Sequence, residues 1–139
     1  MTEENRIRIR RWFDEVWCQK RVEAVDELMA ADALGHGLGE SGAPIQGTRE
    51  FKAFHRKFCD AFPDLHIHVD EVLAEGDLTA VRFTATGSHT GEGLELPPTG
   101  RQVSFTGMVF TRWRDGQVAE GWNLVDFPAM QQQLTAPID

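Results

Sequence analysis

The stretch Arg112-Trp113-Arg114-Asp115-Gly116-Gln117-Val118-Ala119-Glu120-Gly121-Trp122-Asn123-Leu124-Val125-Asp126 decides how this chain of 139 residues folds. Asp115-Gly116 is typical of a tight β-hairpin turn, because such turns need a positive φ, which Gly adopts freely. Side chains on one face of a strand recur at every second residue. This alternation predicts one shared face for Val118, Glu120, Trp122, Leu124 and Asp126. Two carboxylates beside a large aromatic side chain are unusual for plain core, so we expect this face to line a covered pocket.

Composition bounds the class of protein. Hydrophobic residues make up 41% of the chain and charged residues 26%, as in one globular domain, here residues 1–139. The net charge of -8 argues against a nucleic-acid partner, whose phosphates call for a basic face. The N-terminus lacks the apolar run of a signal peptide, and no stretch approaches the length of a membrane span. With only Cys18 and Cys59, at no metal-ligand spacing, we expect a reduced protein of the cytoplasm without a membrane partner.

Three helices are predicted in the first half of the chain. Apolar residues at helical spacing predict an amphipathic helix over about Glu3–Cys18 and a short one over Val22–Met29. A third helix opens near Thr48 and stops at Pro63. The aromatic residues of the first helix fit the core, and a helix across the mouth of a sheet could also lend Trp12 or Trp17 to a pocket.

The second half of the chain reads as long antiparallel strands. Alternating patterns predict strands at Leu65–Asp70, Leu78–Thr86 and Val103–Trp113, followed by the opening stretch. Both faces of the 103–113 strand are rather apolar, so we expect both to be covered. A short helix over Phe127–Leu134 ends the pattern. Helices first and strands later indicate an α+β fold, a cone-shaped curved antiparallel sheet with three N-terminal helices packed over an internal pocket.

The histidines leave alternatives open. His36 lies between glycines, as an exposed loop residue or a site residue. His55 lies on the apolar stripe of the third helix, which fits the edge of the core. His66 and His68 are two apart on a strand, as metal ligands sometimes are, but their face is otherwise the solvent side, so we expect no metal.

Several short motifs, in this order, resemble the SnoaL-like polyketide cyclase (ester cyclase) family. They are Ala61-Phe62-Pro63-Asp64, Ala74-Glu75-Gly76-Asp77, Gly87-Ser88-His89-Thr90-Gly91, Pro98-Thr99-Gly100-Arg101, Gly116-Gln117-Val118-Ala119-Glu120-Gly121-Trp122 with Asp126, and Gln132-Gln133-Leu134. The resemblance covers about Asp32–Leu134. It implies the cone-shaped α+β barrel of the nuclear transport factor 2-like superfamily, with a pocket between sheet and helices and a homodimer or homotetramer as the assembly.

The resemblance also implies a reaction. Cyclases of this family close a ring by intramolecular aldol condensation on a polyketide ester, with no metal and no organic cofactor. They use an aspartate in the pocket as general acid/base, and that role falls on Asp126. His36 and His89 match polar positions near the pocket mouth, and we count all three as candidate catalytic residues.

The chemistry is that of a carboxylate among apolar groups. Desolvation raises the pKa of such a group toward the range useful for proton transfer, and general acid–base catalysis supplies about 10²–10⁴-fold. The expected substrate is a small hydrophobic or polyketide-like molecule. Its candidate binding residues are Trp122, Glu120, Phe62, Trp17, Phe110 and Asn123.

Two residues have a structural alternative. Asp126 precedes Phe127-Pro128, so its carboxylate could cap the final helix. Glu120 could be a paired structural carboxylate, with Arg82 or Arg112 as its partner. A cofactor-free cyclase is therefore one hypothesis, and a non-catalytic small-molecule-binding module of the same fold is another. Ketosteroid-type isomerisation or epoxide opening on this fold is a third.

Overall fold

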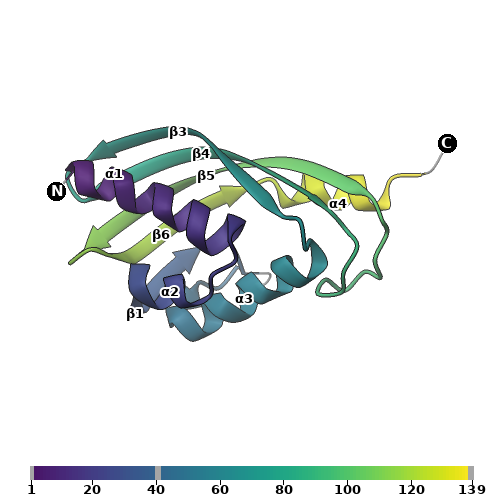
Figure 1. Ribbon diagram of the computed structural model, residues 1–139, viewed down its shortest axis with the longest axis horizontal. Helices are drawn as coiled ribbons and strands as arrows, with labels where there is room; N and C mark the ends of the chain where they lie inside the picture. Colours follow the sequence, from purple (N-terminus) through teal and green to yellow (C-terminus); the bar gives the residue numbers. More distant parts are fainter. Residues whose placement is uncertain (1, 40–41, 138–139) are drawn as a thin grey trace.

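One curved sheet and a set of helices make up the molecule (Figure 1). The computed structural model describes residues 2–39 and 42–137. The helices are α1 Thr2–Arg11, the π-helix η1 Trp12–Cys18, α2 Glu23–Leu28, α3 Gly47–Ala61 and α4 Phe127–Thr135. The strands are β1 Met29–His36, β2 Ile45–Gln46, β3 His66–Glu75, β4 Leu78–Ser88, β5 Gln102–Arg114 and β6 Gln117–Val125.

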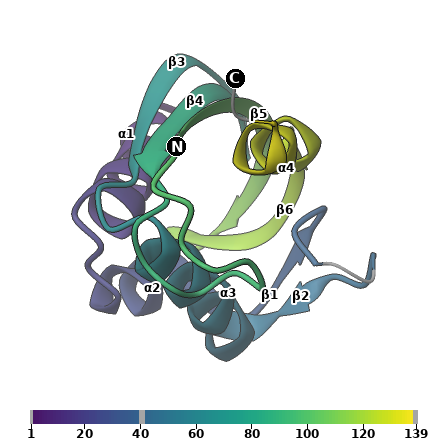
Figure 2. The same ribbon diagram turned by 90° about the vertical axis from the view of Figure 1, so that its right-hand side faces the viewer.

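The sheet has the order β2-β1-β6-β5-β4-β3. All neighbouring strands are antiparallel except β1 and β6, which are parallel. Figure 2 shows the strands from β3 to β6 curling over the interior, with α1, α2 and α3 across the open side. The predicted α+β class and the cone-like curved sheet under three N-terminal helices are confirmed, with the sheet left unclosed.

The helices form where the apolar spacing predicted them. α1 and η1 follow one another without a break, and η1 buries Trp12, Phe13, Val16 and Trp17. Burial of one stripe supplies most of the stability of such helices in a protein. The second helix is shorter than expected, because Met29 already belongs to β1, and Pro63 follows α3 as predicted.

The Asp115-Gly116 turn joins β5 to β6 as predicted. Both residues have positive φ, 53° and 79°, which matches the turn type that suits strand twist. Just beyond it, the pairing of β5 with β6 shifts: Trp113 lies opposite Val118, whereas Arg112 lies opposite Glu120. Ala119 is thus an extra residue, a β-bulge on β6.

This bulge reverses the face of every later residue of β6. Because side chains alternate strictly, one inserted residue exchanges the two faces of the strand. Val118 points inward and is buried, but Glu120, Trp122 and Leu124 lie opposite Arg112, Phe110 and Met108 on the outer face. The expectation of one shared pocket-facing set from Val118 to Asp126 is therefore wrong. The inward set after the bulge is Gly121, Asn123 and Val125.

The expectation that both faces of β5 are covered is wrong for the outer face of the sheet. Met108 and Phe110 are 56% and 57% exposed, and Leu124 on the adjacent strand is 79% exposed. Within the described chain nothing covers these side chains, so only the inner face of β5 is packed, as its strictly alternating burial shows.

Candidate functional site

The interior cavity lies between the inner face of the sheet and the helices. Its volume is about 100 Å³. Every lining residue is uncharged, and almost all are apolar. They are Ile9, Trp12, Phe13, Trp17, Met29, Leu34, Gly35, Leu38, Phe51, Phe54, Phe58, Leu65, Ile67, Phe83, Ala85, Phe105, Val109, Thr111, Val118, Gly121, Asn123, Val125 and Phe127.

The helical wall of the cavity is aromatic. In η1 the backbone winds more widely than in an α-helix, as the 2.8 Å bond from Gln19 N–H to Asp14 O shows. Trp12 of η1 lies 5.1 Å from Phe51 of α3, and Trp17 lies 6.2 Å from Phe54, between ring centroids. Such tilted and edge-on ring pairs are favourable beyond the area they bury, so these contacts hold the apolar wall together.

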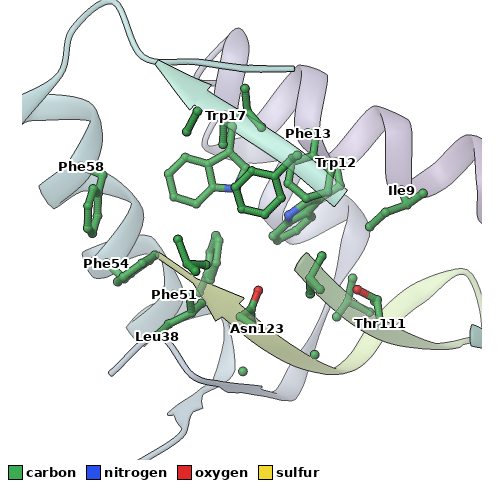
Figure 3. A pocket seen from close by; sticks show the side chains of 18 of the residues that line it. Ile9, Trp12, Phe13, Trp17, Leu38, Phe51, Phe54, Phe58, Thr111 and Asn123 are labelled. Carbon is green, nitrogen blue, oxygen red and sulfur yellow. The ribbon is translucent and has the colours of Figure 1, made fainter. Parts of the chain in front are cut away.

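The sheet wall carries the cavity's two hydrophilic side chains, Thr111 of β5 and Asn123 of β6 (Figure 3). The Asn123 Nδ2 amide donates a hydrogen bond to the backbone oxygen of His36 at 2.9 Å. That bond ties β6 to the neighbouring β1 and fixes the side-chain amide in one orientation.

Of the nine candidate site residues, only Trp17 and Asn123 line this cavity. The structure gathers four others on the outer face of the sheet. His36 Nε2 lies 2.6 Å from Glu120 Oε2, and the His36 ring stacks on Trp122 with centroids 5.7 Å apart. Trp122 in turn lies opposite Phe110 in the strand register. Glu120 is thus a paired carboxylate, and its partner is His36 rather than Arg82 or Arg112.

Asp126 caps the last helix. Its Oδ1 accepts a hydrogen bond from the backbone N–H of Ala129 at 3.1 Å, which satisfies one of the unpaired donors at the start of α4. The residue borders a separate hollow of about 570 Å³ on the outer face, beside Met108, Leu124 and Pro128. It does not line the interior cavity, so the capping alternative describes its place.

His89 and Phe62 form a third group, under the β4–β5 connection. Both side chains are fully buried, with ring centroids 5.5 Å apart. The backbone N–H of Thr99 donates to His89 Nδ1 at 3.2 Å, which leaves the proton of the neutral ring on Nε2. Burial lowers the pKa of His89. Its Nε2 is the sole fully enclosed side-chain polar atom of the described chain without a partner.

The remaining histidines and cysteines lie apart from the cavity. His55 is buried, its Nε2 lies 2.5 Å from the backbone oxygen of Val16, and burial lowers its pKa. His68 lies 3.6 Å from Asp70 on the outer face. Residues 2–39 and 42–137 hold no group of three acidic, His or Cys side chains that could bind a metal. Both cysteines are free, and burial raises the pKa of Cys59 to about 11.

Sequence reasoning missed most of the cavity wall. Phe51, Phe54 and Phe58 were visible as the apolar stripe of α3, a pattern that indicates core as readily as a pocket. Thr111 sits among apolar residues at an inward position of β5, and only the curvature of the sheet turns that position into cavity wall.

Comparisons with known proteins agree with this geometry. A family model for SnoaL-like polyketide cyclases matches residues 7–134, most of the chain. The chain belongs to this family. It is a SnoaL-like protein of the nuclear transport factor 2-like superfamily, and the resemblance seen in its motifs is confirmed.

Solved structures resemble this SnoaL-like protein closely. A candidate SnoaL-like polyketide cyclase from Jannaschia sp. CCS1 is 27% identical, with a TM-score of 0.87 and 99% of this chain and 95% of that chain covered. IdmH from Streptomyces antibioticus, a candidate polyketide cyclase, is 30% identical, with a TM-score of 0.79 and coverage of 91% and 95%.

The fold also occurs in a protein of another name. AclR from Streptomyces galilaeus, a candidate hydroxylase, is 24% identical, with a TM-score of 0.84 and coverage of 100% and 85%, which shows a shared fold. No curated protein matches the chain. In the described part of the SnoaL-like protein, no helix is long and apolar enough to cross a membrane. The cytoplasmic location stays a prediction.

Proposed function

We propose that this SnoaL-like protein binds a small, uncharged, largely apolar molecule of polyketide type in its interior cavity. One observation carries the proposal: none of the residues lining the cavity is charged or titratable. Burial of a charged ligand there would be costly, because no side chain of the wall could neutralise it. Apolar pockets with a few polar groups are typical small-molecule sites.

The same observation favours a binding role over acid–base catalysis. A general acid or base must come within hydrogen-bond reach of the proton it moves. Asp126, Glu120, His36 and His89 are not among the cavity's lining residues. A cyclisation in this cavity would draw its rate from holding a flexible chain folded, since fixed orientation alone supplies large accelerations.

The test compares toluene with benzoate, a ring of similar size that carries a charge. Toluene should bind to the wild-type protein, as measured by NMR titration, and benzoate should not. Val109→Phe places a ring in the cavity and should abolish toluene binding, whereas Met108→Phe, on the opposite face of the same strand, should leave it intact. Benzoate binding as tight as that of toluene would refute an uncharged ligand.

Asp126→Asn separates the two hypotheses further. Asn keeps a side-chain oxygen that can cap α4, so the variant should fold with wild-type stability. We expect it to bind toluene with unchanged affinity. Once a substrate is found, turnover that is unaffected in this variant would support confinement, and turnover reduced by about 10² or more would restore Asp126 as acid/base.

We further propose that the protein forms a homodimer through an outer apolar patch, defined as Met108, Phe110, Trp122 and Leu124. These four large side chains are adjacent across β5 and β6, and all are partly or largely exposed. Together they expose on the order of 400 Å², within the range of about 300–600 Å² for the largest apolar patch of a soluble monomer, which is often functional. An interface of about 800 Å² per partner with an apolar centre accommodates such a patch.

A two-fold copy suits the rim of this patch. Arg82 and Arg112 lie beside it together with Glu71, Asp77 and Glu120. A patch ringed by both signs of charge can meet itself without like-charge repulsion.

The oligomeric state tests the dimer. Phe110→Lys should convert a dimer to a monomer in sedimentation equilibrium while circular dichroism stays unchanged. Leu73→Lys is the matched control, because Leu73 is 64% exposed on β3 outside the patch. A wild-type protein that remains monomeric at the highest concentration tested would end this proposal.

A further inference from the structure

Four unpaired polar groups stand in the cavity wall. They belong to Trp12, Trp17, Thr111 and Asn123. Within residues 2–39 and 42–137, neither indole N–H nor the Thr111 hydroxyl has a side-chain hydrogen bond, and Asn123 Oδ1 accepts none. None of these atoms is fully enclosed by protein, unlike His89 Nε2. Unpaired polar atoms in an otherwise apolar site are expensive unless a ligand or water satisfies them.

The hydrogen bond from Asn123 Nδ2 to the His36 carbonyl orients the side-chain amide so that Oδ1 faces the cavity. Only the NH₂ group can donate to the His36 carbonyl, so Nδ2 points toward β1 and Oδ1 points away from it. Figure 3 shows the side-chain oxygen of Asn123 on the cavity side. A carbonyl oxygen accepts hydrogen bonds and cannot donate, so its complement on a ligand is a hydroxyl or N–H group.

The two indoles offer the opposite chemistry, since an indole N–H only donates. Figure 3 shows Trp12 and Trp17 reaching from the helix toward Asn123. Trp113 provides the contrast within this chain, because its Nε1 donates to Thr79 Oγ1 at 3.0 Å and it does not line the cavity. Of the three buried indoles of the described chain, the two without a partner are thus the ones at the cavity.

We infer that the cavity selects an uncharged ligand with a hydrogen-bond acceptor on its helix side and a hydrogen-bond donor on its β6 side. A carbonyl group facing Trp12 and Trp17 and a hydroxyl group facing Asn123 meet this pattern, so the ligand class is a hydroxy-carbonyl compound on an apolar skeleton. Thr111 can donate or accept and adjusts to either group. The inference rests on the proposed binding of an uncharged molecule in this cavity.

The size of the cavity limits the skeleton. A dry apolar cavity of roughly 150 Å³ accepts a benzene ring, and this one has about 100 Å³. Because this volume is the smaller of the two, one six-membered ring is the upper limit for the part of a ligand held here, and the wall must move apart to admit it. A larger ligand requires displacement of aromatic side chains.

The experiment uses three rings of equal size on the full-length protein. Toluene has no polar group, cyclohexanone only accepts hydrogen bonds, and phenol can donate. The indole N–H signals in ¹H–¹⁵N spectra report directly on the donors. Cyclohexanone should move the Trp12 and Trp17 signals downfield and toluene should not, while those of Trp113 and Trp122 serve as controls that stay in place.

Variants test the acceptor. Asn123→Leu should weaken phenol binding about 2- to 10-fold, the usual worth of one hydrogen bond, and should leave toluene binding equal or tighter. Trp17→Phe should weaken cyclohexanone binding by a similar factor. Trp122→Phe should change the binding of neither phenol nor cyclohexanone.

The outcomes separate the two proposals. If toluene does not bind, the proposed function fails. If toluene binds but cyclohexanone does not move the Trp12 and Trp17 signals downfield, ordered water satisfies the four groups. The inferred selectivity is then overturned. If Asn123→Leu fails to fold, the indole signals of the wild-type protein decide alone.

Discussion

Asn123 and Glu120 stand three residues apart on β6, yet they serve opposite sides of the sheet. Asn123 gives the cavity its acceptor, while Glu120 pairs with His36 outside. Both side chains are polar, and each is held by one identified bond. At the scale of single residues, the titratable side chains of this part of β6 lie outside the cavity, which supports the proposed binding role.

His89 yields a prediction at this scale. Its neutral ring accepts from Thr99 N–H, and burial lowers its pKa in the folded state. Between that lowered pKa and the unfolded value of about 6.5, the unfolded chain binds a proton that the folded chain does not. Stability should therefore fall as the pH drops below about 6.5 and recover above it.

His89→Asn isolates this contribution, because its side-chain oxygen can still accept from Thr99 N–H and does not titrate. The loss of melting temperature between about pH 7.5 and pH 5.5 should be smaller in the variant. Part of this loss should remain in the variant, because burial also lowers the pKa of His55. His66→Asn, at an exposed position of β3, is the control. Equal pH dependence in His89→Asn and wild type would contradict the expectation.

Among the elements, β6 decides which of the predicted site residues face the cavity. The sequence predicted its hairpin turn correctly, because Asp115-Gly116 carries the required backbone conformation in its own chemistry. It could not reveal the bulge at Ala119, because an extra residue in a strand leaves no distinctive side chain. The prediction continued the strict alternation of faces past Ala119. It therefore assigned Glu120, Trp122 and Leu124 to the pocket, although they lie on the outer face.

Deletion of Ala119 tests this account of β6. Without the extra residue, uninterrupted pairing from the turn still places Glu120 opposite Arg112 on the outer face, beside His36. An unpaired buried carboxylate costs on the order of 3–5 kcal/mol, so the deletion variant should lose less than that in denaturant unfolding, because Glu120 stays outside. Ala119→Gly keeps the bulge and should lose no more than about 1 kcal/mol. A loss of about 3–5 kcal/mol in the deletion variant would mean that Glu120 has turned inward and that Ala119 is not the extra residue.

At the scale of the whole molecule, the cavity is what the curved sheet and the helices leave between them. The sequence predicted both layers, since the periodicities of 3.6 and 2 are local properties. The volume and the set of lining residues depend on how the side chains of the two layers interdigitate, and no local pattern records that. The sequence did predict Trp17 as a helix side chain over a pocket. Phe54 lines the same helical wall and limits the size of the cavity.

Phe54→Ala should enlarge the site and change what it accepts. The ring of Phe54 lies at the cavity, 6.2 Å from Trp17 and 4.9 Å from Phe58 between centroids. Its removal should cost about 2–4 kcal/mol, somewhat less than for a fully buried Phe. The protein should then bind naphthalene, measured by NMR titration, at concentrations where the wild type does not. Phe62→Ala removes a buried ring that does not line the cavity and should destabilise without admitting naphthalene. If both variants bind naphthalene alike, general loosening of the core is responsible, and Phe54 does not set the size of the site.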